Sequence, residues 1–186
     1  MDEKLILGTV QFGLDYGITN KNGKLTEYEI EKIFNFCNTN NIFYFDTAQD
    51  YGISENILSK YSKLYSKFNI FTKSKFKNKN INNTIKISLN KFDKIECYLL
   101  HSIDDYKNKD LLNKLISYKN KNKINKIGIS IYNLDEGIKI LNDNIVDIIQ
   151  LPFNYFENQW FNQDFQNLIK KTNIEIHVRS IFLQGI

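Results

Sequence analysis

Two reactive types of side chain lie five positions apart in one short polar stretch of the sequence. The stretch YFDTAQDYGISENIL (44–58) follows an aromatic, apolar run and carries Asp46 and Tyr51, with Asp50 between them. A tyrosine with a pKa of about 10 is a reluctant proton donor, but a nearby ammonium group makes its ionised form less costly. An aspartate and a tyrosine so placed could serve acid–base chemistry, or they could belong to an ordinary polar turn.

Seven short apolar runs recur along the chain and predict β-strands. Their nearly continuous apolar character is expected of strands that helices cover on one face and a barrel core covers on the other. Helical patterns lie between them, and in the clearest one Thr26 and Glu29 form a capping-box pair. The runs are LILGTV (from 5), IFYFDT (from 42), FNIFTK (from 68), IECYLLH (from 95), INKIGIS (from 124), IVDIIQL (from 145) and IEIHVRS (from 174); the helical patterns are TEYEIEKIFNFC, SENILSKY, TIKISLNKF, DLLNKLISYK, LDEGIKILND and FQNLIKKT.

The alternation of strands and helices, with a unit of roughly 30 residues, predicts parallel strands joined by right-handed crossovers. Such strands form either an open doubly wound sheet or an eight-fold barrel. No GxGxxG follows the first strand, which weakens the dinucleotide-binding open sheet. Polar residues gather instead at the carboxyl ends of several strands, which is typical of a barrel. These residues are Asp46, Lys73, His101, Ser130, Gln150 and Ser180.

Composition indicates a single globular domain that spans residues 1–186, with 42% hydrophobic residues to form a core. The formal charge is +4, but the lysines are scattered among asparagines without a continuous basic face, which argues against nucleic-acid binding. Cys37 and Cys97 lack metal-ligand spacing and are expected in the core. No apolar run approaches the ~18 residues of a membrane span, and MDEKLILG does not resemble a signal peptide. We therefore expect a soluble, cytoplasmic protein.

An ordered set of motifs resembles the aldo-keto reductase family, in particular its bacterial branch found with surface-sugar pathways. In that family an aspartate at the end of the second strand precedes a tyrosine by five positions, as Asp46 precedes Tyr51. The resemblance covers essentially the whole chain, and the ordered set is much more specific than any one motif. The motifs are LILGTVQFGLDYGI, FDTAQDYGISENIL, FTK, SLNKF with ECYLLHS, KIGIS, IIQLPFN and RSIFLQG.

The resemblance implies a catalytic tetrad of Asp46, Tyr51, Lys73 and His101 and the reduction of an aldehyde or ketone, possibly a sugar-related one. Hydride transfer to a carbonyl leaves charge developing on its oxygen, which a proton donor must meet. Tyr51 is then the general acid, Lys73 favours its ionised form, Asp46 holds Lys73, and His101 orients the carbonyl. Taken alone, each of the four could be a structural residue.

The neighbours of the tetrad have simpler interpretations. Asp50 is expected to be a solvated loop charge, Ser54 a helix N-cap, and Glu55 a residue favoured by the helix dipole. His177 is expected to be structural. The DYGIT at 15–19 echoes DYGIS at 50–54, but the residues that flank the two segments do not repeat.

The resemblance also implies NADPH as the cofactor. Gly8 and Thr9 would lie by the nicotinamide, Ser130 and Gln150 would hydrogen-bond its carboxamide, and Ile131 departs from the family by standing where an asparagine is usual. The pyrophosphate would be approached by Ser180, Leu183 and Gly185. The alternative for all of these residues is that they are ordinary strand-end polar groups and turn glycines.

Seven predicted strands do not complete an eight-stranded barrel. The sequence therefore predicts an incomplete TIM-type (β/α) barrel of about seven parallel strands, C-terminally truncated, without the eighth strand and the last helices. Open edges on the first and seventh strands could support self-association. Three functional interpretations follow: an NADPH-dependent oxidoreductase, a catalytically inactive remnant or binding protein without cofactor, or an unrelated barrel enzyme.

Overall fold

A computed structural model of the chain describes residues 5–65 and 67–185. Seven strands form one parallel sheet in the order β1-β2-β3-β4-β5-β6-β7. All seven predicted strands are confirmed, although the first is short, because the chain after Gly8 turns into a helix. The strands are β1 (Ile6–Gly8), β2 (Tyr44–Asp46), β3 (Asn69–Ser74), β4 (Ile95–Leu100), β5 (Ile124–Ser130), β6 (Ile148–Pro152) and β7 (Glu175–Arg179).

The six predicted helices are present, and local sequence signals begin several of them. The Thr26 side chain accepts a hydrogen bond from the backbone N–H of Glu29, whose side chain returns to the backbone of Thr26, so the capping box is confirmed. The helices are α2 (Glu27–Thr39), α3 (Ser54–Leu64), α4 (Ile81–Leu89), α6 (Lys109–Asn120), α7 (Leu134–Asp143) and α8 (Gln163–Lys171). The short helices α1 (Val10–Gly13), α5 (Ile103–Lys107) and η1 (Gln159–Phe161) were not predicted.

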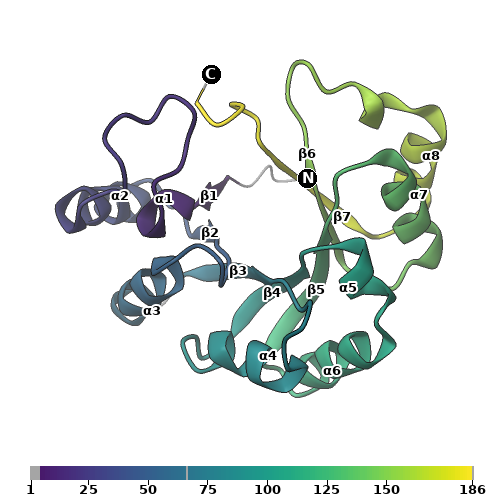
Figure 1. The fold of residues 1–186 in the computed structure, drawn as a ribbon, viewed down its shortest axis with the longest axis horizontal. Helices are drawn as coiled ribbons and strands as arrows, with labels where there is room; N and C mark the ends of the chain where they lie inside the picture. Colours follow the sequence, from purple (N-terminus) through teal and green to yellow (C-terminus); the bar gives the residue numbers. More distant parts are fainter. Residues whose placement is uncertain (1–4, 66, 186) are drawn as a thin grey trace.

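The sheet curls, and the helices lie around its outer side (Figure 1). Consecutive strands are neighbours throughout, with registers such as Gly8 opposite Asp46 and Ser130 opposite Gln150. Within the described residues β1 pairs only with β2 and β7 only with β6. The fold is thus an incomplete TIM-type (β/α) barrel, as predicted. Because all strands are parallel, their carboxyl ends meet at one edge, where the predicted site residues lie.

Each strand contributes to two cores, which explains its continuous apolar character. On β4, Tyr98 and Leu100 join the large core between sheet and helices, whereas Cys97 and Leu99 join a smaller one with Phe71. Side chains of a strand alternate between faces, so neighbours on β4 enter different cores. The smaller core is made of strand residues alone: Phe71, Cys97, Leu99 and Ile148, with Ile6 and Tyr44 packed against them. Both cysteines lie in the described part of the chain and are buried and unbridged, as expected.

Candidate active site

The four residues of the predicted tetrad line one cleft of about 680 Å³. Asp46 ends β2, Lys73 lies near the end of β3, and His101 directly follows β4. Tyr51 lies in the turn that leads into α3. The parallel sheet therefore brings together residues that are up to 55 positions apart, as the difference between 101 and 46 shows. Their catalytic roles remain predictions.

Lys73 and Asp46 form a short ion pair. The Lys73 Nζ lies 2.6 Å from Asp46 Oδ1 and also donates to the carbonyl of Thr47 at 3.1 Å. The Lys73 side chain is only 3% exposed. Burial acts to lower the pKa of Lys73, but the charges and hydrogen bonds of Asp46 and Tyr51 outweigh it, so the pKa is raised. Lys73 therefore stays cationic at neutral pH.

Tyr51 lies beside this ammonium group. The Lys73 Nζ is 5.2 Å from the centroid of the Tyr51 ring. Burial raises the pKa of Tyr51 above its ordinary value, and Lys73 only partly opposes this effect. The lysine acts in the expected direction, but burial is the larger influence in the free cleft. Tyr51 consequently keeps its proton at neutral pH, which a general acid must do before it can donate.

His101 is neutral in this environment. Burial, and then the positive charges of Lys73 and Lys75, lower its pKa from 6.5 to about 4. Its Nδ1 is buried and has no hydrogen-bond partner among the described residues. A neutral imidazole can donate a hydrogen bond from one ring nitrogen and accept one at the other. His101 therefore has unused capacity to bind a ligand in the cleft.

Two glycines hold the turn that carries Tyr51. A Cβ atom on Gly13, the last residue of α1, would lie 1.8 Å from the carbonyl oxygen of Tyr51. A Cβ on Gly52 would lie 2.5 Å from the carbonyl oxygen of Gly13, and Gly52 has a φ of +57°. The two backbones thus approach closely only because neither residue has a side chain. Sequence reasoning missed this contact, since it joins segments that are 39 positions apart, from 13 to 52.

Hydroxyl groups pack behind the turn. The Ser54 Oγ donates to the carbonyl of Thr9 at 2.9 Å, and it also lies 2.8 Å from Thr9 Oγ1 and 3.0 Å from Thr47 Oγ1. The expectation that Ser54 is an N-cap is wrong, because Ile53 occupies that position of α3 and Ser54 is the first helical residue. The Ser54 hydroxyl instead joins the start of α3 to the residues that directly follow β1 and β2.

Glu55 lies deeper than the sequence suggested. Its carboxylate accepts hydrogen bonds from Thr72 Oγ1 and Ser88 Oγ, each at 2.7 Å, and from Lys91 Nζ at 2.9 Å. Its side chain is only 1% exposed. It does stand in the first turn of α3, where the helix dipole favours an acid, but it also fastens α3 to β3 and α4. Asp50, in contrast, is half-exposed in the loop, where Lys79 lies 3.3 Å away.

The cofactor residues that were predicted fall into two groups. Of the seven, Thr9 and Leu183 are absent from the described residues that line the cleft. The Thr9 hydroxyl is fully buried and donates to the carbonyl of Asp46. The other five line the cleft, and their cofactor roles, like those of Thr9 and Leu183, remain predictions. They are Gly8, Ser130, Gln150, Ser180 and Gly185.

Gln150 provides the clearest test of whether a nicotinamide fits. Its Nε2 donates to Asp46 Oδ2 at 2.8 Å, whereas its Oε1 is buried and has no partner among the described residues. A buried oxygen without a donor is costly, and a carboxamide N–H₂ group is the kind of donor that it lacks. Gly8 adds space, because a Cβ there would meet no atom within 4 Å. These residues therefore fit the group that the motifs imply.

The segment after β7 closes one end of the cleft. Ser180, Leu183 and Gly185 all have positive φ values, of 60°, 47° and 103°. The Thr19 Oγ1 donates to the carbonyl of Gly185 at 2.9 Å, and the N–H of Ile18 donates to the carbonyl of Gln184 at 3.0 Å. Figure 1 shows this yellow segment beside the purple loop between α1 and α2.

The profile of the Aldo/keto reductase family matches residues 4–186. The chain belongs to the aldo/keto reductase family. Enzymes of this family are oxidoreductases that use nicotinamide cofactors and small carbonyl substrates. No curated protein matches the sequence significantly.

Solved structures of aldo/keto reductases share the fold. A Pseudomonas aeruginosa protein described as an aldo-keto reductase has a TM-score of 0.77 and 22% identity, covering 96% of this chain and 73% of its own. The holo form of a Bacillus halodurans aldo-keto reductase has a TM-score of 0.75 and 22% identity, and the match covers 98% of this chain and 63% of that protein. Glycerol dehydrogenase of Gluconobacter oxydans has a TM-score of 0.72 and 20% identity, and the match covers 100% of this chain and 62% of that protein. The chain thus spans 62% to 73% of the length of these three.

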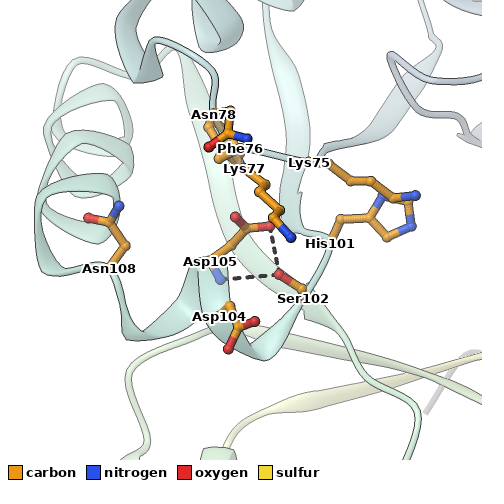
Figure 2. Close-up of a pocket in the computed structure, with 9 residues that line it drawn as sticks. All are labelled: Lys75, Phe76, Lys77, Asn78, His101, Ser102, Asp104, Asp105 and Asn108. Atoms are coloured by element: carbon orange, nitrogen blue, oxygen red, sulfur yellow. Dashed lines mark hydrogen bonds between the residues drawn. The ribbon is translucent and has the colours of Figure 1, made fainter.

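A second hollow lies beside the cleft. It measures about 500 Å³, and Figure 2 shows the residues that line it between the segment after β3 and the start of α6. The Ser102 Oγ donates to Asp105 Oδ2 at 2.9 Å and accepts from the Asp105 N–H at 3.1 Å, as the dashed lines mark. His101 lines both hollows. His101 is thus the one residue of the described linings that the two hollows share.

Two other kinds of site find no support in the part of the chain that the structure describes. No group of three or more His, Cys, Asp or Glu side chains there could hold a metal ion. Among the same residues, no helix combines the length and the apolar character that crossing a membrane demands.

Proposed function

We propose that this protein reduces an aldehyde or ketone to an alcohol with NADPH as the hydride source, with Tyr51 as the general acid. The observation that carries the proposal is the buried Lys73, which lies 2.6 Å from Asp46 Oδ1 and 5.2 Å from the centre of the Tyr51 ring. A buried cation held this way is suited to stabilising a tyrosinate as it forms.

The residues of the chain divide the work. A carbonyl oxygen in the cleft would accept hydrogen bonds from Tyr51 and the neutral His101, which together orient it. The chemistry that a bound nicotinamide nucleotide supplies is hydride donation to the carbonyl carbon. As charge develops on the oxygen, Tyr51 gives up its phenolic proton, and Lys73 stabilises the phenolate that remains. Asp46 keeps Lys73 in place.

The cofactor would be held by residues at the ends of β1, β5 and β6 and after β7. Gln150 Oε1 is the acceptor available to its carboxamide, with Ser130 nearby, and Gly8 leaves room for the ring. Ser180, Leu183 and Gly185 are proposed to approach the pyrophosphate. The preference for NADPH over NADH and the sugar-related nature of the substrate rest on the motif resemblance alone.

Replacement of Tyr51 by Phe tests the proposal. Loss of a positioned general acid should lower kcat for aldehyde reduction by about 10²- to 10⁴-fold while NADPH binding is retained. Tyr16→Phe is the matched control, because Tyr16 also lines the cleft and also precedes a glycine in a DYG segment. Equal activity of the Tyr51→Phe variant and the wild type would exclude Tyr51 as the acid.

A second candidate function is a binding protein or inactive remnant that keeps the tetrad without holding cofactor. It is motivated by the open sheet, in which β1 and β7 each pair with one strand in the described chain. Titration with NADPH, followed by nucleotide fluorescence, separates the two candidates. Saturable binding supports the reductase. Absence of binding at about millimolar NADPH supports the remnant, because even a weak binding free energy of about −4 kcal/mol gives a Kd of about 1 mM.

The open sheet edges also lead us to propose self-association. Val178 on β7 is 46% exposed and Leu5 beside β1 is 65% exposed. Unpaired strand edges with apolar side chains favour pairing with another chain. Light scattering coupled to size exclusion should then detect dimers or larger species whose fraction increases with protein concentration. A mass of one chain at all concentrations would contradict this.

A further inference from the structure

The only arginine of the chain lies in the cleft. Of the 25 basic residues, 24 are lysines, and the remaining one is Arg179 at the end of β7. Arginine differs from lysine in its flat, permanently charged fork of N–H donors, which matches the two oxygens of a carboxylate or phosphate. A chain that otherwise uses lysine at every basic position therefore has this fork at a single place, where it faces the candidate site.

Neutral groups hold the guanidinium in place. It donates to Ser130 Oγ at 3.3 Å, to the carbonyl of Ile131 at 3.2 Å and to Ser180 Oγ at 3.4 Å. Its central carbon lies 4.4 Å from the centroid of the Tyr132 ring, a cation–π distance. These hydrogen bonds are long, whereas charge-assisted ones are about 2.7–2.9 Å. The fork is thus oriented without being saturated.

Arg179 has no acidic partner among the residues that the structure describes. No carboxylate of residues 5–65 or 67–185 forms a salt bridge with it. The charged residues that line the cleft are Asp46, Lys73 and Arg179. Asp46 and Lys73 neutralise each other, so the described lining has a net charge of +1, from +2 and −1. The charge that remains belongs to a half-buried Arg179.

We propose that Arg179 binds an oxyanion, a carboxylate or phosphate group, of the ligand that occupies the cleft. The anion has two chemical sources: an acid group on the carbonyl substrate, or the diphosphate of the cofactor. The first source rests on the proposed reductase function and narrows its substrates to anionic aldehydes or ketones. Either source places a negative group beside Ser130 and Ser180, whose hydroxyls can add hydrogen bonds to it.

Binding measured by calorimetry tests the proposal without any turnover. The probes are succinate, inorganic pyrophosphate and NADPH, each titrated into the wild type, Arg179→Met and Arg179→Lys. Arg179→Met removes the charge and keeps much of the stem, whereas Arg179→Lys keeps the charge and loses the fork. Lys75→Met is the matched control. Within the described residues, Lys75 lines the neighbouring hollow and does not line the cleft. Thermal unfolding of each variant confirms that it is folded.

We expect Arg179→Met to weaken anion binding about tenfold or more, Arg179→Lys to weaken it less, and Lys75→Met to leave it unchanged. A loss confined to succinate identifies the substrate as the source, and a loss of pyrophosphate and NADPH binding identifies the cofactor. Equal affinities of wild type and Arg179→Met for all three probes would overturn the proposal, as would a wild type that binds none. Failure of the chain to reduce aldehydes affects only the proposed reaction and leaves these affinities measurable.

Reduction kinetics then distinguish the substrate more finely. Succinic semialdehyde and butanal share a four-carbon aldehyde chain and differ in the terminal carboxylate. If the substrate is the source, Arg179→Met raises KM for the semialdehyde about tenfold and leaves that for butanal unchanged. An equal change for both aldehydes would overturn the substrate assignment.

Discussion

The two sides of the cleft are built differently. On the side of β2 and β3, charged groups pair at a short distance, 2.6 Å between Lys73 Nζ and Asp46 Oδ1. On the side of β5 to β7, Arg179 makes only hydrogen bonds of 3.2 to 3.4 Å, and Gln150 Oε1 has none among the described residues.

The difference distinguishes a part that is complete from a part that awaits a ligand. Paired, buried charges resist rearrangement, because removing one partner leaves the other without compensation. Unsaturated donors and acceptors around a cleft lower their free energy when a ligand satisfies them. Substitutions on the first side should therefore reduce the stability of the free chain, whereas substitutions on the second side should change ligand binding.

Lys73→Met should produce the largest change in the free energy of unfolding. Removal of the buried ammonium leaves Asp46 uncompensated, and such losses are typically about 3–5 kcal/mol. Urea unfolding measures the change. Lys79→Met is the control, because its pair with Asp50 is half-exposed at 3.3 Å and should contribute less than about 1 kcal/mol. Similar losses in both variants would remove the contrast between the tetrad and an ordinary surface pair.

Gly13→Ala should produce the next largest change in the free energy of unfolding. The new methyl group would lie 1.8 Å from the Tyr51 carbonyl oxygen, so the backbone must move, at a cost of about 3 kcal/mol. The movement should also lower kcat for aldehyde reduction, because Tyr51 lies in that turn. Unfolding and reduction assays on the same variant test both effects. A variant with wild-type stability would show that the close approach is easily relieved.

Gly8→Ala should have little effect on stability and a clear effect on ligand binding. Its methyl group would meet no atom within 4 Å, so the free energy of unfolding should change by less than about 0.5 kcal/mol. The same methyl group would enter the space proposed for the nicotinamide and should raise Kd for NADPH about tenfold. Fluorescence titration measures this affinity. Unchanged NADPH binding would place the nicotinamide elsewhere.

Stability should also depend on pH through His101. The folded pKa of about 4 lies below the ordinary 6.5, so between these values the unfolded chain binds a proton that the folded chain does not. Stability should therefore decrease as the pH falls through this interval. His101→Gln should reduce the decrease.

Urea unfolding at about pH 7 and about pH 5 measures this effect, because the two values differ in the proton uptake of the unfolded state. His177→Gln is the comparison variant. Burial also lowers the pKa of His177, so this variant shows how much of the decrease comes from the other histidine. If wild type and His101→Gln lose equal stability, His101 is not the group that titrates. That result would also weaken the case for a neutral His101 in the cleft.

The sequence predicted most of the fold because its signals are local. Seven apolar runs and the Thr26–Glu29 capping box can each be recognised within about ten residues, and all are present. The short helix α1 was missed, since Val10–Gly13 continues the apolar pattern of β1. Ser54 was misassigned because its partners, Thr9 and Thr47, lie in the segments that follow β1 and β2.

The candidate site was also predicted where its signals are local and missed where it depends on contacts between distant segments. The order of motifs was sufficient to select Asp46, Tyr51, Lys73 and His101, which line one cleft, and to expect most of the residues opposite them. It could not indicate that Thr9 turns its hydroxyl toward Asp46 and Ser54, that Gln150 donates to Asp46, or that Arg179 is left without an acid among the described residues. Those facts depend on which atoms meet across strands.

Residue types and their spacing along the chain were enough to establish the parallel strands, the order of the helices and the family, since each rests on patterns of neighbouring residues. Tertiary structure alone decided the pairing of charges, the raised pKa of Tyr51, the close approach of Gly13 to Tyr51 and the charge that remains on Arg179. The physical reason is that burial and electrostatic interactions depend on distances in space, and the curled sheet brings together groups that are far apart in the sequence.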